Sequence, residues 1–295
     1  MRDEDLREEF AAWLRPVREA DPPGLPVIRR RLRHRRARQA IGGSAALAAV
    51  AGIAVAVSAA LGASPAPARP PATVSSSGPS SNIPVTMSSP RPVQDGYQMS
   101  VSYTVSSPVS SLVVNGGVGT IMITGSQRST VSVSEQVTFS HSPPAMTRDL
   151  AGKTLTLEYE CSNCGVAYDI RVPRGVAVKV TSGTGKIRLS SLSGNVDASS
   201  NVGAITADDL SSAEASFTSG VGTIDATFTA APVTVHAAAS LGGVTIRVPG
   251  TVPYRVNIPA GGLGTSAVSV PQSATSHHVI DASSNEGVVM IEPSS

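Results

Sequence analysis

A glycine-centred phrase recurs along this chain at intervals of about 20 residues. It reads Gly-Val-Gly-Thr-Ile at 117–121 and again at 220–224. Weaker copies begin at Gly183, Asn201, Leu241 and Asn285. Between the glycines, short runs of alternating apolar and polar residues follow one another about every ten residues, so each period contains two short strands. We therefore expect an all-β repeat domain, built either as a two-sheet, β-roll-like solenoid or as a long meander.

The spacing of the glycines supports a regular repeat. Their second members stand at positions 185, 203, 222, 243, 264 and 287, which are 18 to 23 residues apart. A longer phrase, Asp-Ala-Ser-Ser-Asn, occurs at 197–201 and returns at 281–285. The offset of 84 residues (281 minus 197) corresponds to four periods of about 21 residues. The small residues that dominate these repeats suit thin sheets with sharp corners.

Residues 40–62 are predicted to form a transmembrane helix. Ile41–Leu61 contains no charged residue, and at about 1.5 Å per residue it is long enough to cross a hydrocarbon core of roughly 30 Å. Seven arginines lie between Arg29 and Arg38, which predicts a cytoplasmic N-terminus and an extracytoplasmic repeat domain. The same arginines are expected to contact anionic lipid of the inner leaflet. A cleaved signal peptide ending near Ser58-Ala59-Ala60 remains the alternative.

The segments on either side of this helix have distinct compositions. Within the basic tail, residues 1–39, Leu6, Phe10 and Trp13 recur with helical spacing, which indicates a short amphipathic helix. These three residues are the candidate docking site for a cytoplasmic partner, unless the tail simply lies on the inner leaflet. Residues 63–96 are rich in Pro and Ser and are expected to form an extended stalk. The repeat domain then covers residues 97–295.

Two cysteines lie within a region of strict alternation between Thr154 and Val172. A two-residue turn at Ser162-Asn163 would fold this region into an antiparallel hairpin with Cys161 opposite Cys164. Directly opposed residues of an antiparallel pair lie within the distance that a disulfide accepts. Because the predicted compartment lacks the cytosolic thiol pool, we expect a structural disulfide. Free thiols and a metal ion remain the alternatives.

The composition and motifs indicate neither catalysis nor nucleic-acid binding. The net charge is only +2, and the basic residues concentrate in the N-terminal tail, so no nucleic-acid partner is expected. Gly183-Thr184-Gly185 begins like a dinucleotide-binding turn, but Arg188 stands where that turn needs glycine. Asp208-Asp209 is interpreted as a solvated turn rather than as a cation site. We expect no catalytic residue, no cofactor and no metal site; a polysaccharide-active β-helix enzyme is the minor alternative.

One segment and two corners carry a family resemblance. Tyr168–Val176 has the order strand, Val-Pro, Gly, strand, and it is followed by Ser182-Gly183-Thr184-Gly185 and by Ser193-Gly194-Asn195-Val196. Over residues 112–291 this order resembles the bacterial putative-adhesin family of β-strand repeats, a group of unknown function. The resemblance implies adhesion and carries over no catalytic residue.

Together, these features predict a membrane-anchored, surface-displayed repeat protein that acts as an adhesin or envelope scaffold. Its expected partners are an unidentified envelope or surface ligand and, in one reading, other copies of the same chain. The alternative function is a transmembrane regulator or sensor that uses its cytoplasmic helix to hold a partner.

Overall fold

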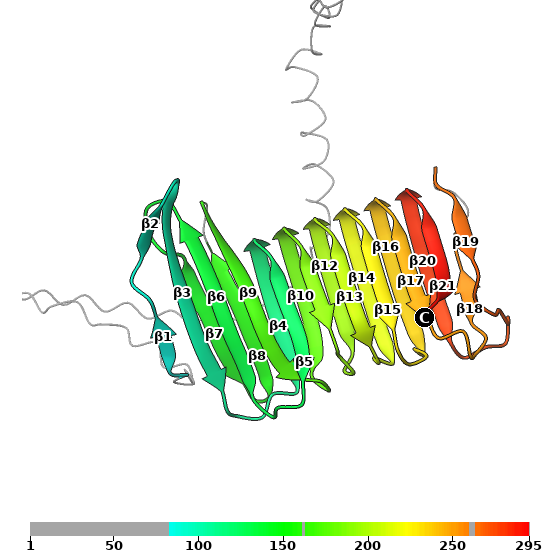
Figure 1. The fold of residues 1–295 in the computed structure, drawn as a ribbon, viewed down its shortest axis with the longest axis horizontal. Coiled ribbons are helices and arrows are strands. Elements are labelled where there is room, and N and C mark those ends of the chain that lie inside the picture. The colour runs from blue at the N-terminus through cyan, green and yellow to red at the C-terminus, as the bar shows by residue number, and fades with distance from the viewer. Residues whose placement is uncertain (1–82, 161–162, 260–262, 295) are drawn as a thin grey trace, which may run out of the picture. The chain divides into compact units, whose positions relative to one another are not determined.

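Short strands separated by glycine-, serine- and asparagine-containing corners build the part of the chain that the computed structural model describes, residues 83–160, 163–259 and 263–294. These strands form two mixed sheets, and no helix is present in these three ranges (Figure 1). The prediction of an all-β domain is therefore confirmed. The described residues belong to a single compact unit, Thr73–Ser295.

The larger sheet, sheet A, has twelve strands, and the smaller one, sheet B, has nine. Sheet A consists of β1 (Val85–Met87), β2 (Arg91–Val93), β3 (Gly96–Val105), β5 (Ile121–Ser126), β6 (Val131–Phe139), β9 (Cys164–Pro173), β11 (Ile187–Ser190), β13 (Ile205–Leu210), β15 (Ile224–Phe228), β17 (Val244–Val248), β19 (Ser266–Val268) and β21 (Val289–Pro293). Sheet B consists of β4 (Ser111–Val118), β7 (Ala145–Ala151), β8 (Thr154–Glu160), β10 (Ala177–Thr184), β12 (Val196–Val202), β14 (Glu214–Val221), β16 (Thr234–Leu241), β18 (Arg255–Asn257) and β20 (Val279–Glu286).

The repeats coil rather than meander. From β10 to β17 the chain alternates between the two sheets, and each strand pairs in parallel with the strand one repeat later. In sheet B, for example, Val178 pairs with Val196, and Val196 pairs with Ala215. Consecutive strands of a meander would pair antiparallel. The parallel register therefore excludes the meander alternative for this region.

The inward-pointing residue of each alternating pair fills the space between the sheets. Ile187, Ile205 and Phe217 are each at most 1% exposed, and the other inward-facing apolar residues of β10 to β17 are likewise buried. Val233 continues the apolar alternation of Val235, but it is 47% exposed because it lies one residue before β16 begins. The alternation therefore predicted the inward face of almost every strand in the repeats.

A column of glycines forms the corners between six strands of sheet B and the strands of sheet A that follow them. Its members are Gly119, Gly185, Gly203, Gly222, Gly242 and Gly287, each with a φ between +139° and +158°. A Cβ atom on Gly203 would lie 1.8 Å from the carbonyl oxygen of Gly185. The corners thus require glycine for both backbone conformation and space. The sequence spacing had pointed to Gly243, but Gly242 occupies the corner.

The last strands do not stack in the order of the sequence. In sheet B the order is β16, β20, β18, so the chain passes to the outer edge before it returns between the two. In sheet A, β21 likewise lies between β17 and β19. The phrases at 197–201 and 281–285 are consequently three strands apart in sheet B, not four. The glycine spacing could not reveal this exchange, because it does not encode which edge of the sheet a strand joins.

The N-terminal end of the body is antiparallel. Strands β1 and β2 both pair with β3, and β3 continues through β6 to β9. Because β1 and β2 lie within residues 63–96, the described part of the predicted stalk belongs to the sheet. The basic tail, the hydrophobic segment at 40–62 and the rest of the stalk lie outside the described residues.

Residues 83–160, 163–259 and 263–294 include no helix that is long and apolar enough to cross a membrane.

The predicted hairpin between Thr154 and Val172 is wrong. Strand β8 lies in sheet B between β4 and β7, whereas β9 lies in sheet A between β5 and β6. Their apolar faces meet across the core instead of side by side, with the ring centroids of Tyr159 and Tyr168 6.5 Å apart. Alternation identifies the buried face of a strand but not its hydrogen-bonded neighbour.

The disulfide between Cys161 and Cys164 stays a prediction. Cys164 begins β9, and Cys161 lies outside the described residues. The argument from direct antiparallel opposition no longer applies, because the strands on either side belong to different sheets.

A buried ionic cluster lies near the N-terminal end of the core. The side chain of Glu135, in β6, is fully buried and accepts hydrogen bonds from Tyr103 Oη (2.8 Å) and Arg148 Nε (3.1 Å). Arg148 comes from β7, the edge strand of sheet B, and its guanidinium lies 5.4 Å from the centre of the Tyr103 ring. Burial raises the pKa of Tyr103, and the neighbouring Glu135 carboxylate raises it further. The cluster joins the two sheets through β6 and β7.

Candidate functional site

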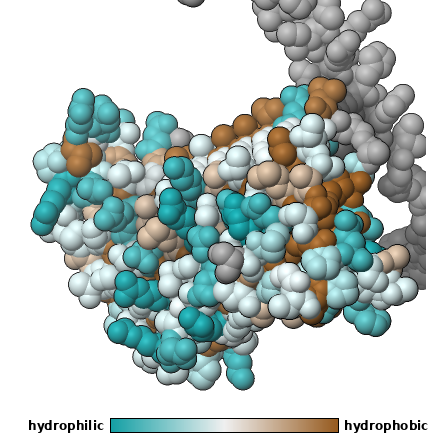
Figure 2. Space-filling view, turned by 45° about the vertical axis from the view of Figure 1, so that its right-hand side comes forward, coloured by the Kyte–Doolittle hydropathy of each residue, from teal (hydrophilic) through white to brown (hydrophobic). Residues whose placement is uncertain are grey.

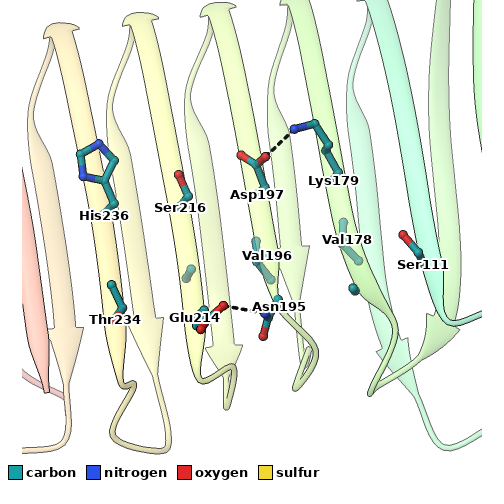
Figure 3. A pocket seen from close by; sticks show the side chains of 12 residues that line it. Ser111, Val178, Lys179, Asn195, Val196, Asp197, Glu214, Ser216, Thr234 and His236 are labelled. Carbon is teal, nitrogen blue, oxygen red and sulfur yellow. Dashed lines mark hydrogen bonds and ion pairs between the residues drawn. The ribbon is translucent and has the colours of Figure 1, made fainter. Parts of the chain in front are cut away.

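Parallel pairing in register aligns one outward side chain from each of six strands of sheet B into a continuous row. Neighbouring members are about 4.8 Å apart, the usual spacing of hydrogen-bonded strands. We call this the polar row, and it contains Lys179, Asp197, Ser216, His236, Asp281 and Asn257. Figure 3 shows its first four members side by side on successive strands. Six adjacent strands therefore present a polar side chain along one line.

A second set of polar side chains runs beside the polar row, nearer the start of each strand. It includes Ser111, Asn195, Glu214 and Thr234. Between the two sets lies a shallow groove of about 460 Å³ that crosses β4, β10, β12, β14 and β16 (Figure 3). The groove runs across the strands, so its length follows from the repeat rather than from any single loop.

Some of these side chains are held in place by one another. Lys179 Nζ donates to Asp197 Oδ2 at 2.7 Å, and Asn195 Nδ2 donates to Glu214 Oε2 at 2.8 Å. The hydrogen bond to Asp197 raises the pKa of Lys179 above its ordinary value, so the lysine is a cation at neutral pH. At the far end of the row, Asn257 Nδ2 donates to Asp281 Oδ1 at 2.7 Å.

Other groups in the groove keep their hydrogen-bonding capacity for a ligand. Among the described residues, none forms a hydrogen bond with the side chain of Ser216, Thr234 or His236. Each of these side chains can donate or accept a hydrogen bond. The arrangement suits an elongated polar ligand that lies across the strands and makes one contact per strand. Individual contacts of this kind are weak, and their number supplies the affinity.

The row also brings Ser216, His236 and Asp281 onto neighbouring strands. A serine nucleophile is activated through a hydrogen bond to its base, and the base is oriented by a second one. Neither contact is present between these three described side chains. The described residues likewise contain no group of three or more His, Cys, Asp or Glu side chains that could hold a metal ion.

Most of the site residues proposed from the sequence cannot be compared with this surface. Leu6, Phe10 and Trp13, together with the arginines at 29–38, lie outside the described residues. Asp208 and Asp209 sit at an irregularity in β13, where Asp209 has a φ of 55° and pairs with Arg174 at 3.8 Å. They belong to a strand rather than to a simple turn, which corrects the sequence interpretation.

Sequence reasoning did not find the polar row, although one signal of it was present. The repeated phrase at 197–201 and 281–285 places Asp197 and Asp281 at equivalent positions of two repeats, and both belong to the row. The other members differ in residue type, so a search for identical residues does not detect them. Aligning the outward position of every strand would have done so.

No family model matches the chain, and no curated protein matches it. Among solved structures, it is similar to a putative cell adhesion protein from Clostridium sporogenes, at 15% identity and a TM-score of 0.44, over 70% of this chain and 100% of that one. A putative adhesin from Bacteroides fragilis shows 16% identity and a TM-score of 0.40, over 66% of this chain and 97% of that one. A putative lipid binding protein from Parabacteroides distasonis shows 10% identity and a TM-score of 0.26, again over 66% and 97%. At these values, neither a family nor a function follows for this chain.

Proposed function

We propose that this chain is a membrane-anchored, non-catalytic β-solenoid displayed outside a bacterial cell, where sheet B binds an extended polar ligand of the envelope or of another surface. The observation that supports this most is the polar row, in which six neighbouring strands each contribute a polar side chain. Adhesion and envelope scaffolding both need a surface of this kind.

The geometry of the groove favours a polymer over a small molecule. The groove is open and shallow, with no Phe, Tyr or Trp side chain among the described residues that line it. Pockets for small ligands are usually concave and largely apolar, and they bury most of the ligand. An extended chain with hydroxyl or charged groups can instead contact several strands at once. The ordered pairs Lys179–Asp197 and Asn195–Glu214 reduce the conformational entropy that binding would cost.

The proposed function differs from the regulatory alternative in what it requires of the chain. A displayed binding surface works without the cytoplasmic tail, whereas a regulator needs continuity across the membrane. We expect the compact unit 73–295, produced alone, to bind insoluble envelope material from the producing bacterium. We also expect polar substitutions at Leu6, Phe10 and Trp13 in the full-length chain to leave that binding unchanged. Cells that produce this variant should also show the same phenotype as cells that produce the parent chain.

Co-sedimentation with envelope material measures binding by the 73–295 unit. A phenotype assay, combined with surface labelling to measure display, tests the variant with substitutions in the tail. An inert 73–295 unit, or a lost phenotype with surface display intact, would favour the regulator.

A further inference from the structure

An exposed row of side chains runs across the C-terminal ends of the strands of sheet B. It is formed by the residue that precedes each corner glycine, and parallel pairing again brings these residues into line. We call it the edge row; in spatial order it contains Val118, Thr184, Val202, Val221, Leu241 and Glu286. Val202, Val221 and Leu241 are 47%, 45% and 45% exposed. Figure 2 shows apolar side chains gathered along the upper edge of the body.

The edge row has opposite charges at the two sides of its apolar centre. Lys186 lies just across the corner from Thr184, with only Gly185 between them in sequence. Glu286 lies at the other side, beyond Leu241. Both side chains are exposed, and neither belongs to any of the ion pairs among the described residues. The three apolar residues at the centre of the row therefore have a cation, Lys186, on one side and an anion, Glu286, on the other.

We infer that the edge row binds the edge row of a second copy of this chain, antiparallel, about a twofold axis that passes beside Val221, between the two copies. In this arrangement Val221 meets its own counterpart, and Val202 meets Leu241 of the second copy. Lys186 then lies opposite Glu286 of the second copy, and the symmetry forms this ion pair twice. Both edges repeat at about 4.8 Å, so all these contacts come into register together.

The size of the edge row limits the strength of this contact. Three half-exposed aliphatic side chains and two rim charges bury far less than the roughly 1,200 Å² of a stable interface. Exposed ion pairs also add little affinity and act mainly on orientation and register. The dimer therefore forms where copies are crowded, as they would be on one membrane, because tethering raises the effective concentration.

Cysteine cross-linking in cells that produce the full-length chain tests this inference. A twofold axis beside Val221 brings the two copies of that residue together, so Val221→Cys should give a disulfide-linked dimer under mild oxidation. Thr218→Cys is the control, because Thr218 is an exposed residue of the same strand, β14, away from the edge row. We expect Val221→Cys to cross-link about tenfold faster, because tethering concentrates both variants equally but only the proposed contact holds position 221 next to its counterpart.

Charge reversal then tests the orientation. In the Val221→Cys background, Glu286→Lys places like charges together and should reduce the cross-linking rate by about fivefold, whereas adding Lys186→Glu should restore it. Equal cross-linking of Val221→Cys and Thr218→Cys would overturn the inference, and so would a double reversal that cross-links no faster than Glu286→Lys alone. Surface labelling of each variant confirms that equal amounts of folded chain are compared.

Discussion

Gly203→Ala should lower the free energy of unfolding of the 73–295 unit by at least about 4 kcal/mol, or prevent folding altogether. Gly203 has a φ of +145°, a conformation that alanine rarely adopts. In addition, the new Cβ would lie 1.8 Å from the carbonyl oxygen of Gly185 and 2.6 Å from its carbonyl carbon. Backbone atoms cannot rotate away as a flexible side chain can, so relief requires adjacent repeats to separate. Denaturant unfolding followed by circular dichroism measures the loss.

Gly175→Ala is the matched control for this prediction. A Cβ on Gly175 would meet nothing within 4 Å, and its φ lies outside the positive range. Alanine at such a position changes stability little or raises it by roughly 0.4–1 kcal/mol, because it restricts the unfolded chain. Equal stability of the Gly203→Ala and Gly175→Ala variants would show that the glycine column does not determine the stacking of the repeats.

Arg148→Met should destabilise the 73–295 unit by about 3–5 kcal/mol, because it leaves the carboxylate of Glu135 buried without its cation. Glu135 is fully buried, and Arg148 donates to both of its carboxylate oxygens. Methionine keeps much of the aliphatic volume of arginine, so the loss reports the charge rather than a cavity.

The double variant Glu135→Gln/Arg148→Met separates charge from packing. The glutamine amide carries no charge, and its oxygen can still accept the hydrogen bond from Tyr103. We expect it to recover more than half of the stability that Arg148→Met loses, as measured by denaturant unfolding. If the double variant is no more stable than Arg148→Met, the cost arises from lost packing around the arginine instead.

The regular part of the fold could be predicted because its signals are local. Glycine at the corners that lead from sheet B to sheet A, and alternation within each strand, follow directly from backbone conformation and burial. The alternation predicted the inward faces of β10 to β17. Pairing depends on contacts between distant segments, and here the sequence misled. Strands β8 and β9 have matching apolar patterns and a short connection, yet they join different sheets. The position of β18 and β19 outside β20 and β21 likewise leaves no trace in the spacing.

The candidate site was missed for a related reason. Neighbours in the polar row, such as Asp197 and Ser216, are separated by a full repeat and share no residue type. Their proximity follows only from the parallel register of the strands. The Glu135–Arg148 pair was missed because alternation places both residues on inward faces, where a charged side chain seems out of place until its partner is known.

Binding of the 73–295 unit to envelope material, with one face of the body blocked at a time, tests the proposed function most directly. Ser216→Trp places a bulky side chain at the centre of the groove on sheet B. Thr206→Trp places the same side chain on β13, at a half-buried outward position of sheet A. We predict that Ser216→Trp weakens co-sedimentation at least about tenfold, a loss of roughly 1.4 kcal/mol, while Thr206→Trp binds like the parent. Equal binding by both variants, or a loss confined to Thr206→Trp, would contradict the assignment of the binding surface to sheet B.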